Sequence, residues 1–115
     1  MRRFVATFTE ATHIAVRIDA APDLFINDRL AAEAFQMIAE GLSNVRRHTG
    51  ASSALIRIGR SDGRFILRIE NESVDKANPL QFTPRSIKGR AEALGGHARV
   101  EDQGDRTAVI VEIPL

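Results

Sequence analysis

The longest regular pattern of apolar and polar positions covers residues 28–50, DRLAAEAFQMIAEGLSNVRRHTG. Its apolar residues recur at steps of three and four, the spacing that forms one apolar stripe along an α-helix. The stripe consists of Leu30, Ala34, Phe35, Ile38, Leu42 and Val45. Asp28 is suited to cap the first turn, and Gly50 to end the last one. The pattern therefore predicts one long amphipathic helix.

A second, polar line runs beside this stripe. Glu40, Asn44 and His48 are four residues apart, so their side chains stack along one flank of the helix, with Arg47 next to them. Spacing alone favours an ordinary solvated flank. However, Asn is a poor helix former because its side chain competes for backbone groups, and a mid-helix Asn is often retained for its polar atoms. The flank is therefore a candidate site.

Alternation of apolar and polar residues predicts five strands. They are residues 13–19, a hairpin of 53–60 and 64–71, and a hairpin of 97–103 and 106–113. Ser61-Asp62-Gly63 and Gly104-Asp105 are typical turn sequences. We expect the apolar side chains of the first hairpin to be Leu55, Ile58, Phe65, Leu67 and Ile69. Ala108 and Ile110 indicate that the final strand is covered on both faces.

Two shorter helices complete the pattern. Residues 2–10 place Phe4, Val5 and Phe8 on one helical face, although an alternating strand is the competing interpretation. Residues 84–94 predict a core helix with an Ile87, Ala91 and Leu94 stripe, which Gly95-Gly96 ends. We expect Thr83 as its N-cap and Pro84 at its first position. Residues 72–83 form a long loop, and long loops are often functional. The order of elements predicts a two-layer α/β sandwich.

Composition narrows the class of protein. The 115 residues predict a single domain spanning 1–115, with the 43% hydrophobic and 27% charged content of an ordinary globular protein. The absence of cysteine excludes disulfides and thiolate metal sites. A net charge of +1 without Trp or Tyr argues against nucleic-acid binding. No apolar run could span a bilayer and no signal-peptide pattern is present, which fits a cytoplasmic setting.

Two segments resemble a known family. EGLSNVRRH, residues 40–48, resembles the N box of the histidine-kinase-type ATPases, in which Glu-x-x-x-Asn precedes a basic residue and often a His. RSIKGRAEALGG and TAVIVEIPL, residues 85–96 and 107–115, resemble the end of the ATP-binding domain in sensor histidine kinases of the NarL and DesK type. The resemblance covers nearly the whole chain. It implies a mixed sheet of about five strands with helices on one face, the Bergerat ATPase fold.

The same resemblance implies roles for the polar flank, with ATP and Mg²⁺ as cofactors. Asn44 corresponds to the family's Mg²⁺ ligand, and an Asn oxygen is a suitable hard ligand for that ion. Glu40 corresponds to the catalytic carboxylate that holds a magnesium-bound or attacking water. Arg47 and His48 would lie toward the phosphates.

The base contact departs from the family pattern. The family ends its central strand with Asp-x-Gly-x-Gly, whose Asp accepts from the adenine amino group. Here Asn71 takes the place of the Asp, and Ser73 and Asp75 replace the glycines. Asn71 keeps an acceptor but lacks the charge, which weakens the bond. Asp75 could replace it if the strand end shifts, and a plain turn role for Asn71 is the structural alternative. Thr107 matches a Thr near the adenine, although a simple strand residue fits equally well.

The glycine-rich lid is the second departure. QFTPRS, residues 81–86, stands where the family carries Gly-x-Gly-Leu. Without those glycines, loop amides approach phosphates less easily. The amides at the start of the second core helix, with Arg85, Ser86 and Lys88, offer another anion site. Plain capping with solvated basic residues is an equal alternative.

The resemblance implies the ATP- and Mg²⁺-binding catalytic domain of a two-component sensor histidine kinase. Such a domain supplies the γ-phosphate to a His on a separate dimerization domain, and a response regulator acts downstream. None of His13, His48 and His97 lies in an acceptor sequence, so this chain alone should not autophosphorylate. We expect no nucleic-acid partner, no membrane contact by this domain, and a place in the cytoplasm or in the cytoplasmic part of a membrane-bound sensor.

Two alternatives remain open. A degenerate ATPase-like domain that has lost nucleotide binding could act as an interaction or regulatory module, and both departed motifs favour this. The intact N box opposes it. A small anti-sigma-type kinase of the same superfamily shares the fold but matches the C-terminal segments less well. The abrupt start at Met1 favours a piece of a longer protein.

Overall fold

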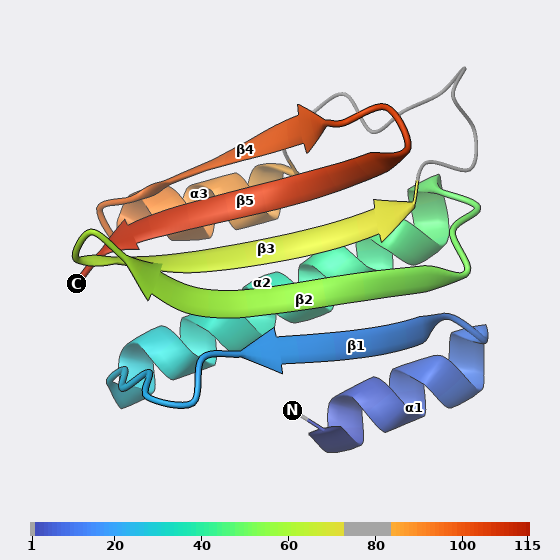
Figure 1. Ribbon diagram of the computed structural model, residues 1–115, viewed down its shortest axis with the longest axis horizontal. Coiled ribbons are helices and arrows are strands. Elements are labelled where there is room, and N and C mark those ends of the chain that lie inside the picture. The colour runs from blue at the N-terminus through green and yellow to red at the C-terminus, as the bar shows by residue number, and fades with distance from the viewer. Residues whose placement is uncertain (1, 73–83) are drawn as a thin grey trace.

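The computed structural model of the chain describes residues 2–72 and 84–115, except for the side chain of His48. It contains three helices and five strands in these ranges (Figure 1). In chain order they are α1 (Arg2–Thr12), β1 (Ala15–Ala20), α2 (Asp28–His48), β2 (Ser53–Ser61), β3 (Arg64–Glu72), α3 (Arg85–Ala93), β4 (His97–Asp102) and β5 (Arg106–Pro114). Every predicted helix and strand is therefore present, and residues 2–10 are helical as expected.

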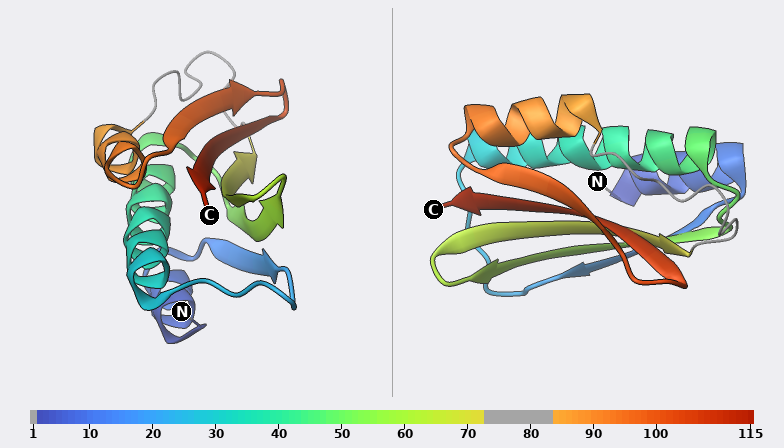
Figure 2. Two further views of the ribbon diagram at one scale, coloured as in Figure 1. Left: turned by 90° about the vertical axis from the view of Figure 1, so that its left-hand side faces the viewer. Right: turned by 90° about the horizontal axis from the view of Figure 1, so that it is seen from above.

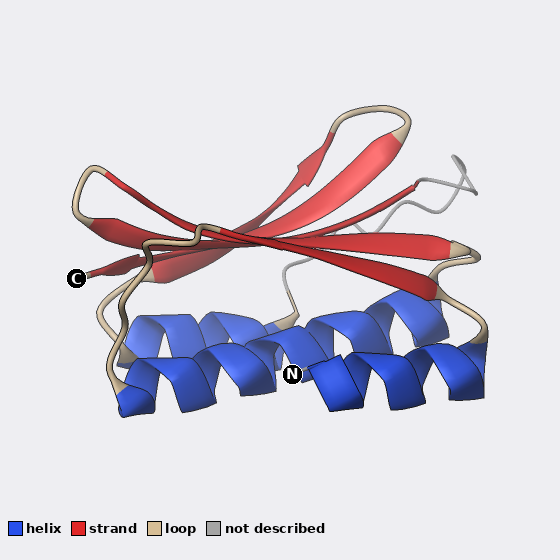
Figure 3. Ribbon diagram, turned by 60° about the horizontal axis from the view of Figure 1, so that its bottom comes forward, coloured by secondary structure: helices blue, strands red, loops and turns tan. Residues whose placement is uncertain are grey.

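The five strands form one mixed sheet in the order β1-β2-β3-β5-β4. β1 is parallel to β2, and all other neighbours are antiparallel. All three helices lie on the same face of this sheet, and among the described residues no helix covers the opposite face (Figures 2 and 3). The predicted two-layer architecture with helices on one face is confirmed.

The helix α2 supplies the centre of the core. Met37, Ile38 and Leu42 are fully buried against the sheet, and of the predicted stripe only Phe35 is half-buried. Phe35 instead meets Phe4 of α1 edge-on, with ring centroids 5.3 Å apart. Gly41 allows α2 to approach β3, because a Cβ there would lie 2.4 Å from Cδ1 of Ile69. Neither Met37 nor Gly41 was part of the predicted stripe.

Two predicted helix starts are wrong by one residue. Asn27, not Asp28, is the N-cap of α2, and its Oδ1 accepts from the N–H of Leu30 at 2.8 Å. Thr49 caps the C-terminus, where its hydroxyl donates to the Val45 carbonyl at 2.6 Å, and the predicted terminator Gly50 follows directly after it. Pro84 takes the N-cap position of α3 without a side-chain cap bond, and the predicted cap Thr83 lies outside the described residues.

The first hairpin adds a residue of β2, Ile56, to the apolar side chains expected from the sequence. Asp62 and Gly63 both have positive φ, as a two-residue type I′ turn requires. Ile56 is fully buried, whereas Leu55 lies on the opposite face. Leu55 and Ile58 cannot share a face, because side chains alternate along a strand and these residues are three apart.

The end of α3 explains its two glycines. Gly96 N–H donates to the Ala91 carbonyl and Gly95 N–H to the Glu92 carbonyl, which together form a Schellman motif with Gly95 at φ +80°. A Cβ on Gly96 would lie 2.0 Å from the Glu112 carbonyl oxygen of β5. The chain therefore turns from α3 into β4 directly against the sheet.

Candidate functional site

The predicted polar flank of α2 is connected by side-chain contacts. Asn44 is 7% exposed, and its Oδ1 accepts from Nη2 of Arg47 at 3.3 Å. The same Nη2 lies 3.8 Å from Oε1 of Glu40. Arg47 therefore bridges the other two residues along the helix, as the three- and four-residue spacing predicts.

The contacts that Arg47 makes with Asn44 and Glu40 are weak. The Arg47 and Glu40 side chains are 49% and 36% exposed, and exposed ion pairs contribute about 0–1 kcal/mol. The amide oxygen of Asn44 and the Glu40 carboxylate nevertheless turn toward one cationic group. A pair of hard oxygen ligands presented to a cation is chemically suited to Mg²⁺.

Two buried polar residues face each other at the ends of neighbouring strands. Asn71 of β3 is 4% exposed and pairs in register with Thr107 of β5, which is 2% exposed. Nδ2 of Asn71 donates to the Glu72 carbonyl at 2.9 Å. The predicted positions of Asn71 and Thr107 are thus adjacent across the sheet.

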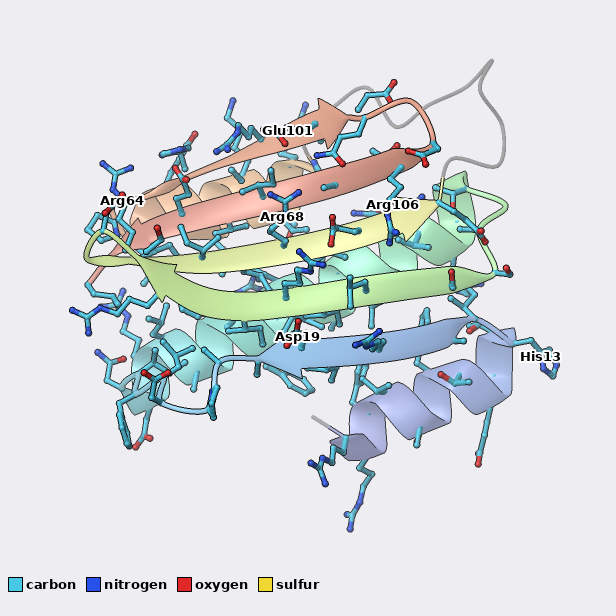
Figure 4. All side chains as sticks on the ribbon, viewed as in Figure 1. His13, Asp19, Arg64, Arg68, Glu101 and Arg106 are labelled. Carbon is cyan, nitrogen blue, oxygen red and sulfur yellow. The ribbon has the colours of Figure 1, made fainter. Side chains whose placement is uncertain are left out.

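Glu72 and Ser52 are polar partners at this site that sequence reasoning missed. Glu72 Oε1 accepts from the Ser52 hydroxyl at 2.7 Å and from the Ser52 N–H at 2.8 Å. These two bonds lower the pKa of Glu72 below its usual value, and the nearby Arg106 adds to the effect. Arg106 opposes Glu72 in register and is labelled in Figure 4. Ser52 lies 20 residues before Glu72, and no local pattern connects the two.

The helix flank and the strand ends lie at the same end of the molecule. The last part of α2, the end of β3 and the start of β5 share one side in Figure 1, and the view from above in Figure 2 agrees. Thr49 continues this connection, because its hydroxyl also accepts from the N–H of Ala51, next to Ser52. Helix α2 and the strand end that carries Asn71 are thus linked through residues 49–52.

The first turn of α3 lies beside another part of α2, near Glu33. Arg85, Ser86 and Lys88 are exposed. Arg85 and Ser86 line a cavity of about 390 Å³ beside Glu33 of α2. Glu33 lies 11 residues before Asn44, which is about 16 Å along a helix. Among the described residues, no hydrogen bond or ion pair joins these three residues to the polar flank.

The other predicted residues stay apart from this end or outside the description. His13 is exposed at φ +60°, and His97 contacts Glu112 at 2.8 Å on the sheet. The side chain of His48 and the alternative base contact Asp75 are not among the described atoms. Within the described ranges, no three His, Cys, Asp or Glu residues gather as a metal site. No helix in these ranges is long and apolar enough to cross a membrane.

Sequence comparison identifies sensor histidine kinases as relatives, although no family model matches the chain. Sensor histidine kinase LiaS of Bacillus subtilis is 28% identical over 98 residues, which cover 81% of this chain and 27% of LiaS. Sensor histidine kinase NarS of Mycobacterium tuberculosis is 28% identical over 114 residues, which cover 91% of this chain and 27% of NarS. The chain thus spans about a quarter of the length of these curated relatives.

Structural comparison identifies the same fold. The histidine kinase domain of a blue-light activated kinase from Erythrobacter litoralis superposes with a TM-score of 0.75 at 17% identity, over 99% of this chain and 58% of that one. The histidine kinase AdeS of Acinetobacter baumannii gives a TM-score of 0.71 at 16% identity, over 97% and 59%. The chain is therefore similar in sequence to sensor histidine kinases and shares its fold with part of these histidine kinase structures.

Proposed function

We propose that the chain is the ATP- and Mg²⁺-binding catalytic domain of a two-component sensor histidine kinase. Its task would be to present the γ-phosphate to a His on a separate helical dimerization domain. The observation that carries the proposal is the arrangement of Glu40, Asn44 and Arg47. In it, the side-chain oxygens of Asn44 and Glu40 both face the guanidinium group of Arg47. This arrangement fits the roles that the N-box resemblance implies.

The flank would hold the metal with help from the nucleotide. Asn44 Oδ1 is the proposed Mg²⁺ ligand, and Glu40 the group that holds a magnesium-bound or attacking water. Mg²⁺ takes most of its ligands from phosphates and water in such sites, so a cluster of carboxylates is not required. Arg47 and His48 would then turn toward the phosphates.

The strand ends would hold the base. Asn71 Oδ1 would accept from the adenine amino group, and Thr107 lies beside it across the sheet. A neutral amide makes a weaker bond than the family's carboxylate. We therefore expect ATP to bind, but less tightly than a site with Asp would allow.

The start of α3 would supply the phosphate contacts that the missing lid glycines do not. Pro84 caps no amide with a side chain, so the first N–H groups of α3 are left for an anion. Arg85, Ser86 and Lys88 add positive charge and a hydroxyl to this helix start. Arg85 and Ser86 also line a hollow beside Glu33 of α2.

The chain itself would perform positioning and charge neutralisation, which is most of what phosphoryl transfer requires from a protein. The acceptor His, the dimerization domain and the response regulator are separate partners, and the proposed setting is the cytoplasm. A degenerate interaction module is not favoured, because such a module has no evident need to bury Asn44 and Asn71 together.

Calorimetric titration with a non-hydrolysable ATP analogue, with and without Mg²⁺, tests this function. The wild-type chain should bind with magnesium dependence, and Asn44→Ala should remove that dependence. Gln36→Ala is the matched control, because Gln36 is an exposed polar residue two turns earlier on the same helix. Absence of binding by the folded wild-type chain at millimolar nucleotide would reject the proposal.

A further inference from the structure

The last residues of β2 have a strand neighbour on one side only. β1 ends at Ala20, which pairs with Ile58, whereas β2 continues to Ser61. The N–H of Ala21 donates to the Ile58 carbonyl at 2.9 Å, and the chain then turns away toward α2. Figure 1 shows β2 extending beyond the tip of β1. Among the described residues, 59–61 therefore form a free edge of the sheet.

The backbone of Arg60 directs its hydrogen-bonding groups toward this free side. Ser61 and Arg64 flank a two-residue turn, so they are a hydrogen-bonded pair of the hairpin. Along an antiparallel pair, successive residues alternate between bonding toward the partner strand and bonding away from it. The bond from Ala21 to the Ile58 carbonyl fits this alternation. The N–H and C=O of Arg60 thus continue the same row and can pair with an added strand.

A hollow lies beside this edge on the face of the sheet that no described helix covers. It has a volume of about 320 Å³, and Asp19, Arg57, Gly59 and Arg68 are among its lining residues. Gly59 keeps the hollow open, because an added Cβ at this position would meet no atom within 4 Å. A glycine inside a strand often marks a place where another chain or a ligand approaches closely.

The first hollow has an excess of positive charge. Arg57 and Arg68 lie 3.5 and 3.4 Å from Glu70, so two guanidinium groups share one carboxylate. Both contacts are long, and Glu70 Oε2 is buried without a hydrogen bond from any described residue. With Arg60 and Asp19 on the lining, three guanidinium groups stand against two carboxylates. The Arg57 side chain is 56% exposed, so it can bind an incoming carboxylate.

A second hollow lies on the helix side of the same edge. The Arg60 side chain points to this side, because side chains alternate along a strand. The hollow has a volume of about 250 Å³, and Asp23, Leu24 and Phe25 also line it. Arg60 and Asp23 balance each other in charge, and the Phe25 side chain at the rim is 89% exposed. An aromatic side chain is a common anchor in protein interfaces, so this hollow suits an apolar group.

We propose that residues 59–61 and these two hollows, together the β2 edge site, bind an extended segment of a partner protein as an added strand. Successive side chains of such a segment point to opposite faces, so one enters each hollow. The cationic hollow takes a carboxylate, and the neutral hollow takes an apolar side chain. The partner is therefore a segment in which acidic and apolar residues alternate, held by backbone hydrogen bonds at its centre.

The probe is a five-residue peptide of alternating Val and Glu, acetylated and amidated at its ends. An NMR titration of the isotope-labelled 115-residue chain follows the backbone amide shifts. We expect saturating shifts at residues 59–61 and at Leu24 and Phe25. Two further peptides test the chemistry. A peptide with Lys in place of Glu should bind about tenfold more weakly, because its charge is reversed. A peptide with N-methylated backbone should lose about the same factor, because it cannot donate to the edge.

Two variants separate the two hollows. Gly59→Val fills the cationic hollow, and a β-branched residue suits a strand, so folding should not suffer. Phe25→Ala removes the exposed aromatic side chain. Each variant should bind the Val–Glu peptide about tenfold more weakly. The controls are Ser53→Val, at an exposed position on the same face of β2, and Leu115→Ala, at another exposed apolar residue. Both should bind like the wild type, and thermal unfolding verifies that every variant is folded.

Three results would overturn the proposal. The first is a wild-type chain that shows no saturating shift with millimolar Val–Glu peptide. The second is unchanged binding in folded Gly59→Val and Phe25→Ala. The third is a dimer of the chain alone in analytical ultracentrifugation that Gly59→Val abolishes, because a second copy would then occupy the edge. None of these results depends on nucleotide, since residues 59–61 lie at the opposite end of the β2–β3 hairpin from Asn71.

Discussion

At the scale of single residues, buried polar side chains mark the site. Among the described residues, Asn44, Glu70, Asn71 and Thr107 are the buried polar or charged ones. Three of these four lie on α2 or on the strand ends beside it. Burial of an amide is costly unless strong hydrogen bonds compensate it, and the bond from Arg47 to Asn44 is long at 3.3 Å. Stability alone therefore gives no reason for an Asn at position 44.

Asn71 makes a hydrogen bond that an Asp at this position could not make, because its Nδ2 donates to the Glu72 carbonyl. The substitution Asn71→Asp tests the contribution of this bond. A buried carboxylate cannot donate to the Glu72 carbonyl, so the change removes one hydrogen bond and sets oxygen against oxygen. We expect it to lower the free energy of unfolding by about 1–3 kcal/mol, measured by urea denaturation at neutral pH.

Asn27→Asp is the matched control for this substitution. Asn27 is an exposed N-cap, and Asp caps a helix equally well, so the free energy of unfolding should be nearly unchanged. If Asn71→Asp is as stable as the wild type, the Glu72 carbonyl does not hold the side chain in the way described.

The residue scale also separates what the sequence predicts from what it cannot. The flank of Glu40, Asn44 and Arg47 follows from helical spacing, because all three lie on one element. The hydrogen bonds between Ser52 and Glu72 depend on how β3 and the segment before β2 come together in the sheet. Such long-range register leaves no local signal. Asp28 and Asn27 are both good caps, so sequence alone could not choose between them.

At the scale of elements, a glycine within α3 and a glycine just after it have opposite roles. Gly89 lies exposed within the helix, and an added Cβ would meet no atom within 4 Å. Gly96 lies against the β5 backbone, where a Cβ would overlap the Glu112 carbonyl. The first glycine only weakens the helix, whereas the second is required by the packing.

This contrast predicts opposite effects of the same substitution. Gly89→Ala should raise the free energy of unfolding by about 0.5–1 kcal/mol, because Ala favours the helix. Gly96→Ala should lower it by about 1–3 kcal/mol, because the added methyl forces the backbone apart. Thermal or urea unfolding measures both. Equal signs for the two variants would contradict the described packing at the α3–β4 turn.

Helices and strands with a regular apolar pattern could be predicted from the sequence. Which face of each element is buried could be predicted only in part. The boundaries of α2 and of both hairpins agree with the expected ranges to within two residues, because turn sequences punctuate them. The core face of β2 cannot be chosen from the sequence, because both of its faces carry apolar residues, Leu55 on one and Ile56 on the other. Only pairing with β3 decides which face meets the helices.

At the scale of the whole molecule, the two faces of the sheet differ in character. The uncovered face carries ion pairs, among them Glu112 with Arg64 and Arg99, each 3.6 Å apart. Arg64, Arg68 and Glu101 are labelled over these strands in Figure 4. Half-exposed pairs of this kind contribute little stability. These ion pairs place charged groups on the uncovered face, whereas the candidate site lies where α2 meets the ends of β3 and β5.

The overall architecture could be predicted because the order of elements limits how two layers can pack. The full set of nucleotide contacts could not be predicted in the same way. The segment that would carry the lid, residues 73–83, lies outside the described residues, and its lack of glycines removes the family's usual signal. The affinity for a nucleotide therefore depends on residues that the pattern of apolar and polar positions does not identify.

The most direct test of the central claim is an NMR titration of the isotope-labelled chain with a magnesium-bound, non-hydrolysable ATP analogue. We expect the largest changes in backbone amide shift at residues 40–48, at Asn71 and Glu72, and at Arg106 and Thr107. Saturating shifts at these positions would establish the nucleotide site between α2 and the strand ends. Shifts confined to the hollow near Arg57 and Gly59 on the other face, or no shifts at all, would contradict it.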